Sequence, residues 1–241
     1  SPNAVSSPQS RIPISEFLAL MAAPLPRRPK TSPTRRPATS PTRRWSRARA
    51  ESNSDCSQNR SMSAPRSWDV FCHVIDNFGD AAVCWRLARA LAQSSERDAG
   101  NPRNAARSRL WIDDLGALHA LQPKVLIDST RQTVAGVEVC HWVDGADYGA
   151  PADVAVDAFG AGLPDQYASA MAARSGKSLW IVLEYLSAES WVAAHHRLPS
   201  PHPRLPLDRY FFFPGFGAGT GGLLLESGLA ARRDDFLRHP L

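Results

Sequence analysis

The sequence predicts an α/β fold with a Rossmann-like parallel sheet and helices on both of its faces. From residue 67 onward, short apolar runs alternate with segments whose apolar residues recur at helical spacing. The first run, 68–75, is rich in aromatic and β-branched residues, as is typical of a strand that is buried on both faces. The alternation of strands with helices favours a parallel sheet that is covered on both sides.

The first predicted unit is a strand, a tight loop and a helix. The strand at 68–75 runs into a turn cluster that extends from Asp76 to Asp80. A helix is expected from about Asp80, which is placed to cap it or to lie in its first turn. Its apolar residues recur at helical spacing: Val83, Cys84, Leu87, Ala90 and Leu91. In doubly wound sheets, ligands bind at the carboxyl ends of the strands, so this loop is the first candidate for chemistry.

Turn residues and apolar runs assign the elements that follow. The polar stretch 94–108 contains Gly100 and Pro102 and predicts a loop, and a strand at 109–112 ends at Asp113. A short helix is expected at 115–121, because Pro123 would stop it. Further strands are expected at 125–127, 137–142 and 153–156.

The last part of the chain continues the alternation. Pro164 opens a helix at 163–173, and the strand at 179–183 ends at Glu184. Ser187 is placed to cap a helix that runs through His195. The proline-rich segment 198–206 predicts a loop, and a strand at 210–213 completes the sheet.

Acidic residues follow the predicted strands. They are Asp76 and Asp80 after the first strand, then Asp113 with Asp114, Asp157 and Glu184. In a parallel sheet these side chains would gather at one edge and form an electronegative crevice. Such a crevice favours a basic acceptor such as a guanidinium over a phosphate-bearing ligand. The alternative is that each acid simply caps or ends its own loop.

The basic pI of the chain describes its first part and not the predicted domain. Residues 1–66 carry a net charge of +9, whereas residues 67–241 carry −4. The first 66 residues are rich in Ser, Pro and Arg and too poor in large apolar residues to build a core, so disorder is expected there. This segment is interpreted either as a nucleic-acid-binding arm or as a non-native extension ahead of a start at Met62, and we favour the extension.

The cysteine and histidine patterns predict neither disulfides nor zinc. The cysteines form no C-x-x-C pair, and burial in a reducing cytosol explains them. His195-His196 has no further ligands at metal spacing nearby. The apolar island at 17–25 is too short to span a membrane. These patterns together predict a cytoplasmic protein without a membrane partner.

Several motifs resemble one known family. They are WDVFC at 68–72, VIDNFGD at 74–80, VCWRLAR at 83–89, LWIDDL at 110–115, LEYLSAE at 183–189, LPSP at 198–201, YFFFPGF at 210–216 and TGGLL at 220–224. In this order and spacing, they are similar to the bacterial elongation factor P arginine rhamnosyltransferases. The resemblance extends over roughly residues 67–238.

The resemblance implies a glycosyltransferase with the two-domain GT-B architecture. Members of the family move rhamnose from dTDP-rhamnose to an arginine of elongation factor P with inversion, and they need no cofactor or metal. The N-terminal half receives the protein acceptor, whereas the C-terminal half holds most of the donor site. No specific nucleic acid is expected as a partner.

The resemblance also assigns roles to residues of this chain. Asp76 and Asp80 match the catalytic aspartates. The expected acceptor-binding residues are Asn77, Phe78, Gly79, Asp113, Asp157 and Glu184. The expected donor-binding residues are Tyr210, Phe211, Phe212, Phe213, Gly221 and Gly222. Ala81 and Ala82 depart from the Ile-Gly that is common in the family, which puts the fit of a ligand near the first helix in question.

The expected organisation is a disordered extension at 1–66, an acceptor-binding domain at 67–213, and at 214–241 a linker that begins a missing donor-binding domain. The chain is therefore expected to be an N-terminal fragment that is inactive alone. Two alternatives remain. The G-x-G-x-x-G match at 217–222 would suit a dinucleotide-binding oxidoreductase domain, and the basic extension would suit a nucleic-acid-associated protein.

Overall fold

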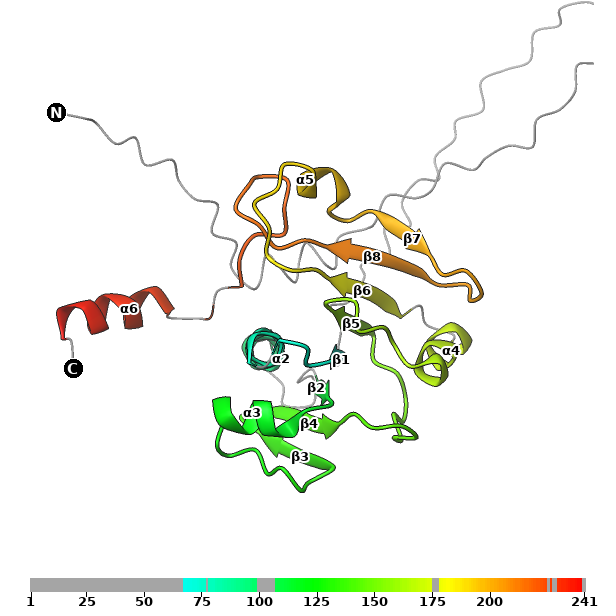
Figure 1. Cartoon of the computed structure of the whole chain (residues 1–241), viewed down its shortest axis with the longest axis horizontal. Coiled ribbons are helices and arrows are strands. Elements are labelled where there is room, and N and C mark those ends of the chain that lie inside the picture. Colours follow the sequence, from blue (N-terminus) through cyan, green and yellow to red (C-terminus); the bar gives the residue numbers. More distant parts are fainter. Residues whose placement is uncertain are drawn as a thin grey trace, which may run out of the picture.

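The computed structural model describes residues 67–76, 78–98, 107–174, 178–224, 226 and 229–239. The expectations for residues 1–66 and for Asn77 lie outside this part of the chain. Within it, an α/β fold with a largely parallel sheet is confirmed (Figure 1).

The described residues form an eight-stranded sheet in the order β3-β4-β2-β1-β5-β6-β8-β7. The inner strands pair in parallel, and only the edge strands β3 and β7 are antiparallel to their neighbours. The strands are β1 Ser67–Cys72, β2 Arg107–Ile112, β3 Arg131–Val134, β4 Val137–His141, β5 Val154–Ala158, β6 Leu179–Leu183, β7 Pro199–Pro201 and β8 Asp208–Phe212.

Helices cover both faces of the sheet, as Figure 1 shows for α2 and α3 on one side and α4 on the other. The described helices are α2 Gly79–Asp98, α3 Leu115–Leu121, α4 Asp165–Ala173, α5 Val192–His195 and α6 Leu229–Arg238. Alternate strand residues serve the two faces, because successive side chains of a strand point to opposite sides. In β1, Val70 packs into the core beneath α2, whereas Phe71 packs against Tyr167 of α4.

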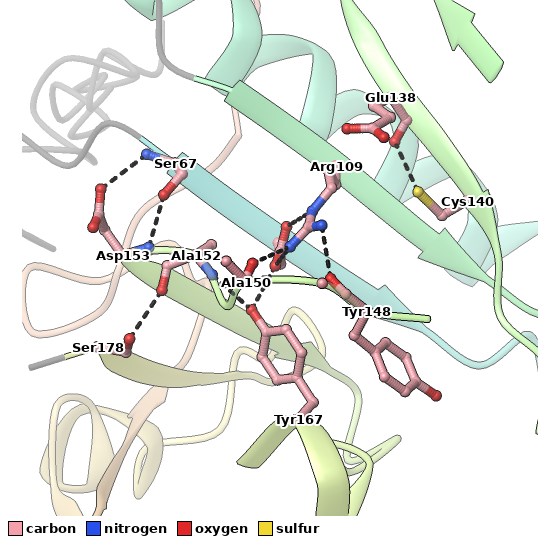
Figure 2. Close-up of polar contacts among 12 residues, drawn as sticks. Ser67, Arg109, Glu138, Cys140, Tyr148, Ala150, Ala152, Asp153, Tyr167 and Ser178 are labelled. Carbon is pink, nitrogen blue, oxygen red and sulfur yellow. Dashed lines mark hydrogen bonds and ion pairs between the residues drawn. The ribbon is translucent and has the colours of Figure 1, made fainter. Parts of the chain in front are cut away.

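A buried polar network fixes the inner strands on the α4 side of the sheet. The Arg109 guanidinium of β2 forms an ion pair with Asp69 of β1, and both side chains are almost fully buried. Figure 2 shows Arg109 reaching the loop before β5, where it donates to the carbonyl oxygens of Tyr148 at 2.9 Å and Ala150 at 3.0 Å. The hydroxyl of Tyr167 also donates to Asp69, and burial raises the pKa of Tyr167, so the phenol stays protonated. The network is structural, because each charge has its partner within the core.

Arg86 of α2 holds the segment that follows β8. Its guanidinium forms an ion pair with Glu226 and donates to the carbonyl oxygen of Leu224 at 3.1 Å. Leu224 and Glu226 are therefore tied to the side of α2.

The structure corrects several boundaries in the first half of the domain. The predicted loop at 94–108 is wrong at both ends, because α2 continues to Asp98 and β2 begins at Arg107. The predicted strand at 125–127 is also wrong. Val125 is buried there without joining the sheet, and the next strand is β3, which forms a hairpin with β4. Ala135 and Gly136 make the turn with positive φ values of 48° and 80°, which matches the twist of a tight hairpin.

The second half shows two further corrections. The helix predicted from Ser187 to His195 begins only at Val192, because Ser187 instead forms a bridge with Gly215. The predicted loop at 198–206 contains the edge strand β7, Pro199–Pro201. Proline lacks an N–H, and an edge strand tolerates this because one side of it needs no partner. Helices α3 and α4 and strand β6 confirm the predictions at 115–121, 163–173 and 179–183.

Candidate functional site

The acids predicted to follow strands lie near one edge of the sheet, with one correction: the strand predicted at 153–156 continues to Ala158, so Asp157 lies within β5 and does not follow it. Strands β2, β1, β5 and β6 are parallel neighbours, and the register aligns their last residues: Cys72 lies beside Ile112 and Ala158, and Ala158 lies beside Leu183. The residues that follow these strands therefore emerge along one carboxyl edge.

Asp80 is the most firmly held of these acids. It is the second residue of α2 and only 1% exposed, so of the two predicted positions it takes the first turn of the helix. Its carboxylate turns back toward the preceding loop, where Oδ2 accepts from the N–H groups of Ile75 at 3.1 Å and Asp76 at 3.0 Å. Oδ1 accepts from the hydroxyl of Tyr185 at 3.1 Å. These bonds give the carboxylate a single orientation.

Asp76 lies in the same loop but is exposed. Its carbonyl oxygen accepts from the N–H of Gly79 at 2.8 Å and closes the turn. A Cβ atom on Gly79 would stand 2.9 Å from Oδ2 of Asp76, so the glycine leaves room for that carboxylate above the start of α2. Phe78, between them, is 53% exposed. The loop thus presents one free carboxylate beside one fixed carboxylate.

The acids after β2 have local partners. Asp113 accepts from the N–H of Val74 at 2.9 Å through Oδ1 and contacts the imidazole of His73 through Oδ2. Asp114 caps α3, because its Oδ1 accepts from the N–H of Ala117 at 2.9 Å. Capping of α3 is therefore a sufficient reason for an acidic residue at position 114. Asp113, which follows β2, instead contacts His73 and Val74, which follow β1.

Asp157 and Glu184 are partly or largely buried acids, and the positive charge of Arg209 acts on Asp157. Asp157 is 3% exposed and its Oδ1 accepts from the N–H of Gly162 at 2.8 Å, yet burial raises its pKa above the ordinary value. Burial also raises the pKa of the half-buried Glu184, and the negative charge of Asp157 adds to that shift. Carboxylates whose pKa values are raised by burial and by a like charge favour a cation beside them. Arg209 supplies part of that positive charge for Asp157, so Glu184 is the better suited of the two acids to a basic ligand.

Tyr185 belongs to this site although it was not among the predicted site residues. It directly follows Glu184, and its ring is 51% exposed. The ring stacks on Phe159 with a centroid distance of 4.3 Å and an interplanar angle of 14°. Burial, and then the hydrogen bond to Asp80, raise the pKa of Tyr185, so its hydroxyl remains a donor. The sequence signals for it were its place beside an acid at the end of a strand and its position in the LEYLSAE motif at 183–189.

The aromatic residues predicted to bind the donor are buried or half-buried. Phe212 is 4% exposed and Phe213 is 8% exposed, whereas Tyr210 and Phe211 are half-buried. The ring of Phe212 lies so close to Gly221 that a Cβ there would stand 2.1 Å from it. Gly221 donates to the carbonyl oxygen of Phe213 at 2.8 Å, so the glycine-rich segment folds back on the end of β8.

The glycine-rich segment 217–222 is not followed directly by a helix. Gly222 has a φ of 70°, and its carbonyl oxygen accepts from the N–H of Gly215 at 3.1 Å. This closed loop lacks the strand–turn–helix context that a dinucleotide fingerprint needs. Within the described residues, no group of three or more His, Cys, Asp or Glu side chains could hold a metal ion. No helix of that part of the chain is long and apolar enough to cross a membrane.

Comparison with known proteins gives one consistent match. A family model described as "Elongation-Factor P (EF-P) rhamnosyltransferase EarP" matches residues 68–241. Proteins named "Protein-arginine rhamnosyltransferase" are similar to this chain over 170 residues, with 47% identity in Pseudomonas putida and 44% in Pseudomonas aeruginosa. A protein of the same name from Shewanella oneidensis is 37% identical over 180 residues. These matches cover 70–72% of this chain but only 42–43% of each relative. The chain thus spans less than half the length of these relatives.

Proposed function

Because the chain belongs to the elongation factor P rhamnosyltransferase family, we propose that residues 67–213 form the acceptor-binding domain of a protein-arginine rhamnosyltransferase. The acceptor is an arginine of elongation factor P, and the enzyme works in the cytoplasm. The observation that carries the proposal is the carboxyl edge itself, which the loop of Asp76 and Asp80 after β1 shares with Asp113 after β2 and Glu184 after β6.

The chemistry of the acceptor explains why carboxylates are needed. A guanidinium is always protonated near neutral pH and is therefore a poor nucleophile. Paired carboxylates hold it through parallel N–H···O bonds and localise its charge. In the transfer, a terminal nitrogen of the arginine forms a bond to the anomeric carbon of rhamnose while the bond from that carbon to the diphosphate oxygen breaks. A proton leaves the guanidinium to a carboxylate, and inversion follows from attack on the opposite face.

The two aspartates are suited to different parts of this task. Asp76 is exposed and has room to move, so it can reach the guanidinium directly. Asp80 is fixed by the N–H groups of Ile75 and Asp76 and provides a pre-oriented second carboxylate. Phe78, Gly79, Asp113, Asp157 and Glu184 form the surroundings in this proposal, with the acids supplying an attractive field.

The donor is proposed to be dTDP-rhamnose, and the whole enzyme is proposed to have the GT-B architecture. Residues 214–241 would then lead into a donor-binding domain. The donor would meet this chain at the end of β8, near Tyr210, Phe211 and the glycines Gly221 and Gly222. The tight contact between Phe212 and Gly221 supports a structural role for that pair at the edge of the donor site.

Equilibrium binding of elongation factor P to the 241-residue chain tests the proposal. The variants Asp76→Asn and Asp80→Asn keep the shape of each side chain but remove its charge. Each is expected to weaken binding by at least about tenfold, because the acceptor guanidinium loses a charged partner. Asp208→Asn is the matched control, since Asp208 begins β8 and lies at the opposite edge of the sheet. If the wild-type chain binds no elongation factor P, or if both site variants bind as well as the control, the proposal is wrong.

A further inference from the structure

The contacts of Tyr185 connect the ends of neighbouring strands. Tyr185 follows β6, its ring stacks on Phe159 after β5, and its hydroxyl donates to Asp80 at the start of α2. Asp80 lies 105 residues away in the sequence, so this hydrogen bond depends on the assembled sheet. The phenol supplies the only side-chain donor that the structure records for the Asp80 carboxylate within the described residues, beside the backbone donors of Ile75 and Asp76.

Phe159 is held in an unfavourable backbone conformation to support this ring. Its φ is 59°, a left-handed value that bulky residues rarely adopt. Its N–H donates to the carbonyl oxygen of Leu183 at 2.7 Å, which fixes it beside the end of β6. The loop then continues through Gly160 and Gly162, which also have positive φ values of 73° and 78°. Strain of this kind is found where the surrounding structure requires a particular placement, and functional sites are common among such places.

We propose that Tyr185 is a positioning residue of the acceptor site, which holds the Asp80 carboxylate in the orientation that receives a planar guanidinium and thereby favours arginine over lysine. This role rests on the proposed function. Phe159 supports Tyr185 from one side, and about half of the tyrosine surface remains open beside the aspartate loop.

Orientation matters more for arginine than for lysine. A guanidinium presents its N–H groups in a rigid planar fork, and two parallel bonds form only when the carboxylate lies in the matching plane. An ammonium is a compact charge whose donors rotate, so it binds a carboxylate in many orientations. Loss of the phenol donor frees Oδ1 of Asp80 to move while the backbone donors still hold Oδ2. The loss should therefore reduce binding of arginine and leave binding of lysine nearly unchanged.

The test measures affinity for elongation factor P and for its variant in which the acceptor arginine is lysine. Tyr185→Phe keeps the ring and removes only the hydroxyl. It is expected to weaken binding of the arginine form about tenfold, the scale of one hydrogen bond to a charged group. Binding of the lysine form should change by less than about twofold, so that the preference for arginine falls. Tyr148→Phe is the matched control, because Tyr148 packs in the core on the α4 side of the sheet, whereas Asp80 lies at the start of α2 on the other side.

A second arm separates positioning from a general loss of packing. In an Asp80→Asn background, the substitution Tyr185→Phe should add little, since the carboxylate that the phenol orients is already gone. Equal weakening of the arginine and lysine forms, no weakening of either, or a full additional loss in the Asp80→Asn background would each overturn the role of Tyr185. If the wild type prefers arginine and Asp80→Asn loses that preference while Tyr185→Phe does not, only this inference fails. A wild-type chain that binds neither form would overturn the proposed function and this role together.

Discussion

At the scale of single residues, the site depends on the contrast between Asp76 and Asp80. They lie in one loop, yet one is exposed and the other is buried and bonded to Ile75, Asp76 and Tyr185. A loop that only had to turn the chain would not need a buried carboxylate that accepts several hydrogen bonds. In the proposed site, this contrast would let the Asp76 carboxylate adjust to the guanidinium while the Asp80 carboxylate stays fixed.

Gly79→Ala tests whether the place of the Asp76 carboxylate matters. The added Cβ would stand 2.9 Å from Oδ2 of Asp76, and that flexible side chain can move away cheaply. Alanine also favours a helix over glycine by about 0.5–1 kcal/mol, so the free energy of unfolding should not fall. Acceptor binding should weaken by at least about threefold, since displacement of the carboxylate disturbs one charged contact. Urea unfolding and calorimetric titration measure the two effects. Unchanged binding would show that the position of Asp76 is irrelevant to the acceptor.

Asp157 allows a prediction about pH. Burial raises the pKa of Asp157 in the folded chain, so ionised Asp157 opposes folding at neutral pH, and this opposition disappears as the carboxyl becomes protonated in acid. Asp157→Asn removes the buried charge and keeps an oxygen for the N–H of Gly162. The variant should be at least as stable as the wild type at pH 7, and any gain should vanish toward about pH 4, near the ordinary carboxyl pKa.

Urea unfolding of wild type and variant at both pH values measures the effect of Asp157→Asn. A variant that is less stable at pH 7 than at acid pH, relative to wild type, would contradict the assigned burial effect. Acceptor binding at pH 7 is expected to weaken at the same time, because one attractive charge is lost from the edge.

At the scale of elements, the parallel order of β2, β1, β5 and β6 turns separate sequence signals into one site. Asp113 directly follows β2, Glu184 directly follows β6, and Asp157 is the last residue but one of β5. The shared register brings these strand ends together. The buried network around Asp69 helps to hold that register, because it joins β1, β2 and α4 through side chains. The acids of the proposed site lie beyond the carboxyl ends of β1 and β2, whereas the Asp69–Arg109 ion pair lies within these strands.

Asp69→Asn tests this support. The change leaves the buried Arg109 guanidinium without its charged partner, although the carbonyl oxygens of Tyr148 and Ala150 remain. Loss of one partner from a buried ion pair lowers the free energy of unfolding by about 3–5 kcal/mol. Chemical unfolding measures this loss, and Asp208→Asn at an exposed position serves as the control. A loss below about 1 kcal/mol would mean that the pair contributes no more than a surface salt bridge.

Elements with strong local signals could be predicted from the sequence, and those set by long-range contacts could not. Helix α3 has its cap Asp114 and ends just before Pro123, and β6 is a compact apolar run. By contrast, the prolines of β7 predicted a loop. The segment is a strand because it pairs with β8 at the edge of the sheet. Val125 was predicted to lie in a strand, but it is buried in the core from a segment that does not join the sheet. The capping pattern at Ser187 predicted the start of a helix, but Ser187 forms a β-bridge with Gly215 instead.

The same division applies to the site. The acids at strand ends could be predicted, because a parallel sheet follows from the alternation of elements and places its carboxyl ends together. The bond from Tyr185 to Asp80 could not, since it joins residues 105 positions apart. The left-handed backbone of Phe159 could not be predicted either, because the local sequence pattern does not favour a positive φ at this position. The predicted roles of Tyr210 and Phe211 toward the donor stay predictions.

At the scale of the whole molecule, charge separates the domain from the first part of the chain. Residues 67–241 carry a net charge of −4 and residues 1–66 carry +9. Under the proposed function, an acidic domain with acids near one edge would attract a basic acceptor site. The match to the family model begins at residue 68, within β1, so the acidic part of the chain is the part that matches the family.

The most direct measurement of the central claim is NMR of elongation factor P with nitrogen-15 in its arginine guanidinium groups. On addition of the 241-residue chain, the terminal nitrogen signals of one arginine should shift and separate. Bidentate contact with carboxylates slows rotation of the guanidinium, which makes its terminal nitrogens distinct. The change should be absent with a chain that carries both Asp76→Asn and Asp80→Asn and present with Asp208→Asn. Binding that leaves every arginine signal unchanged, or a change that persists in the double variant, would contradict the account.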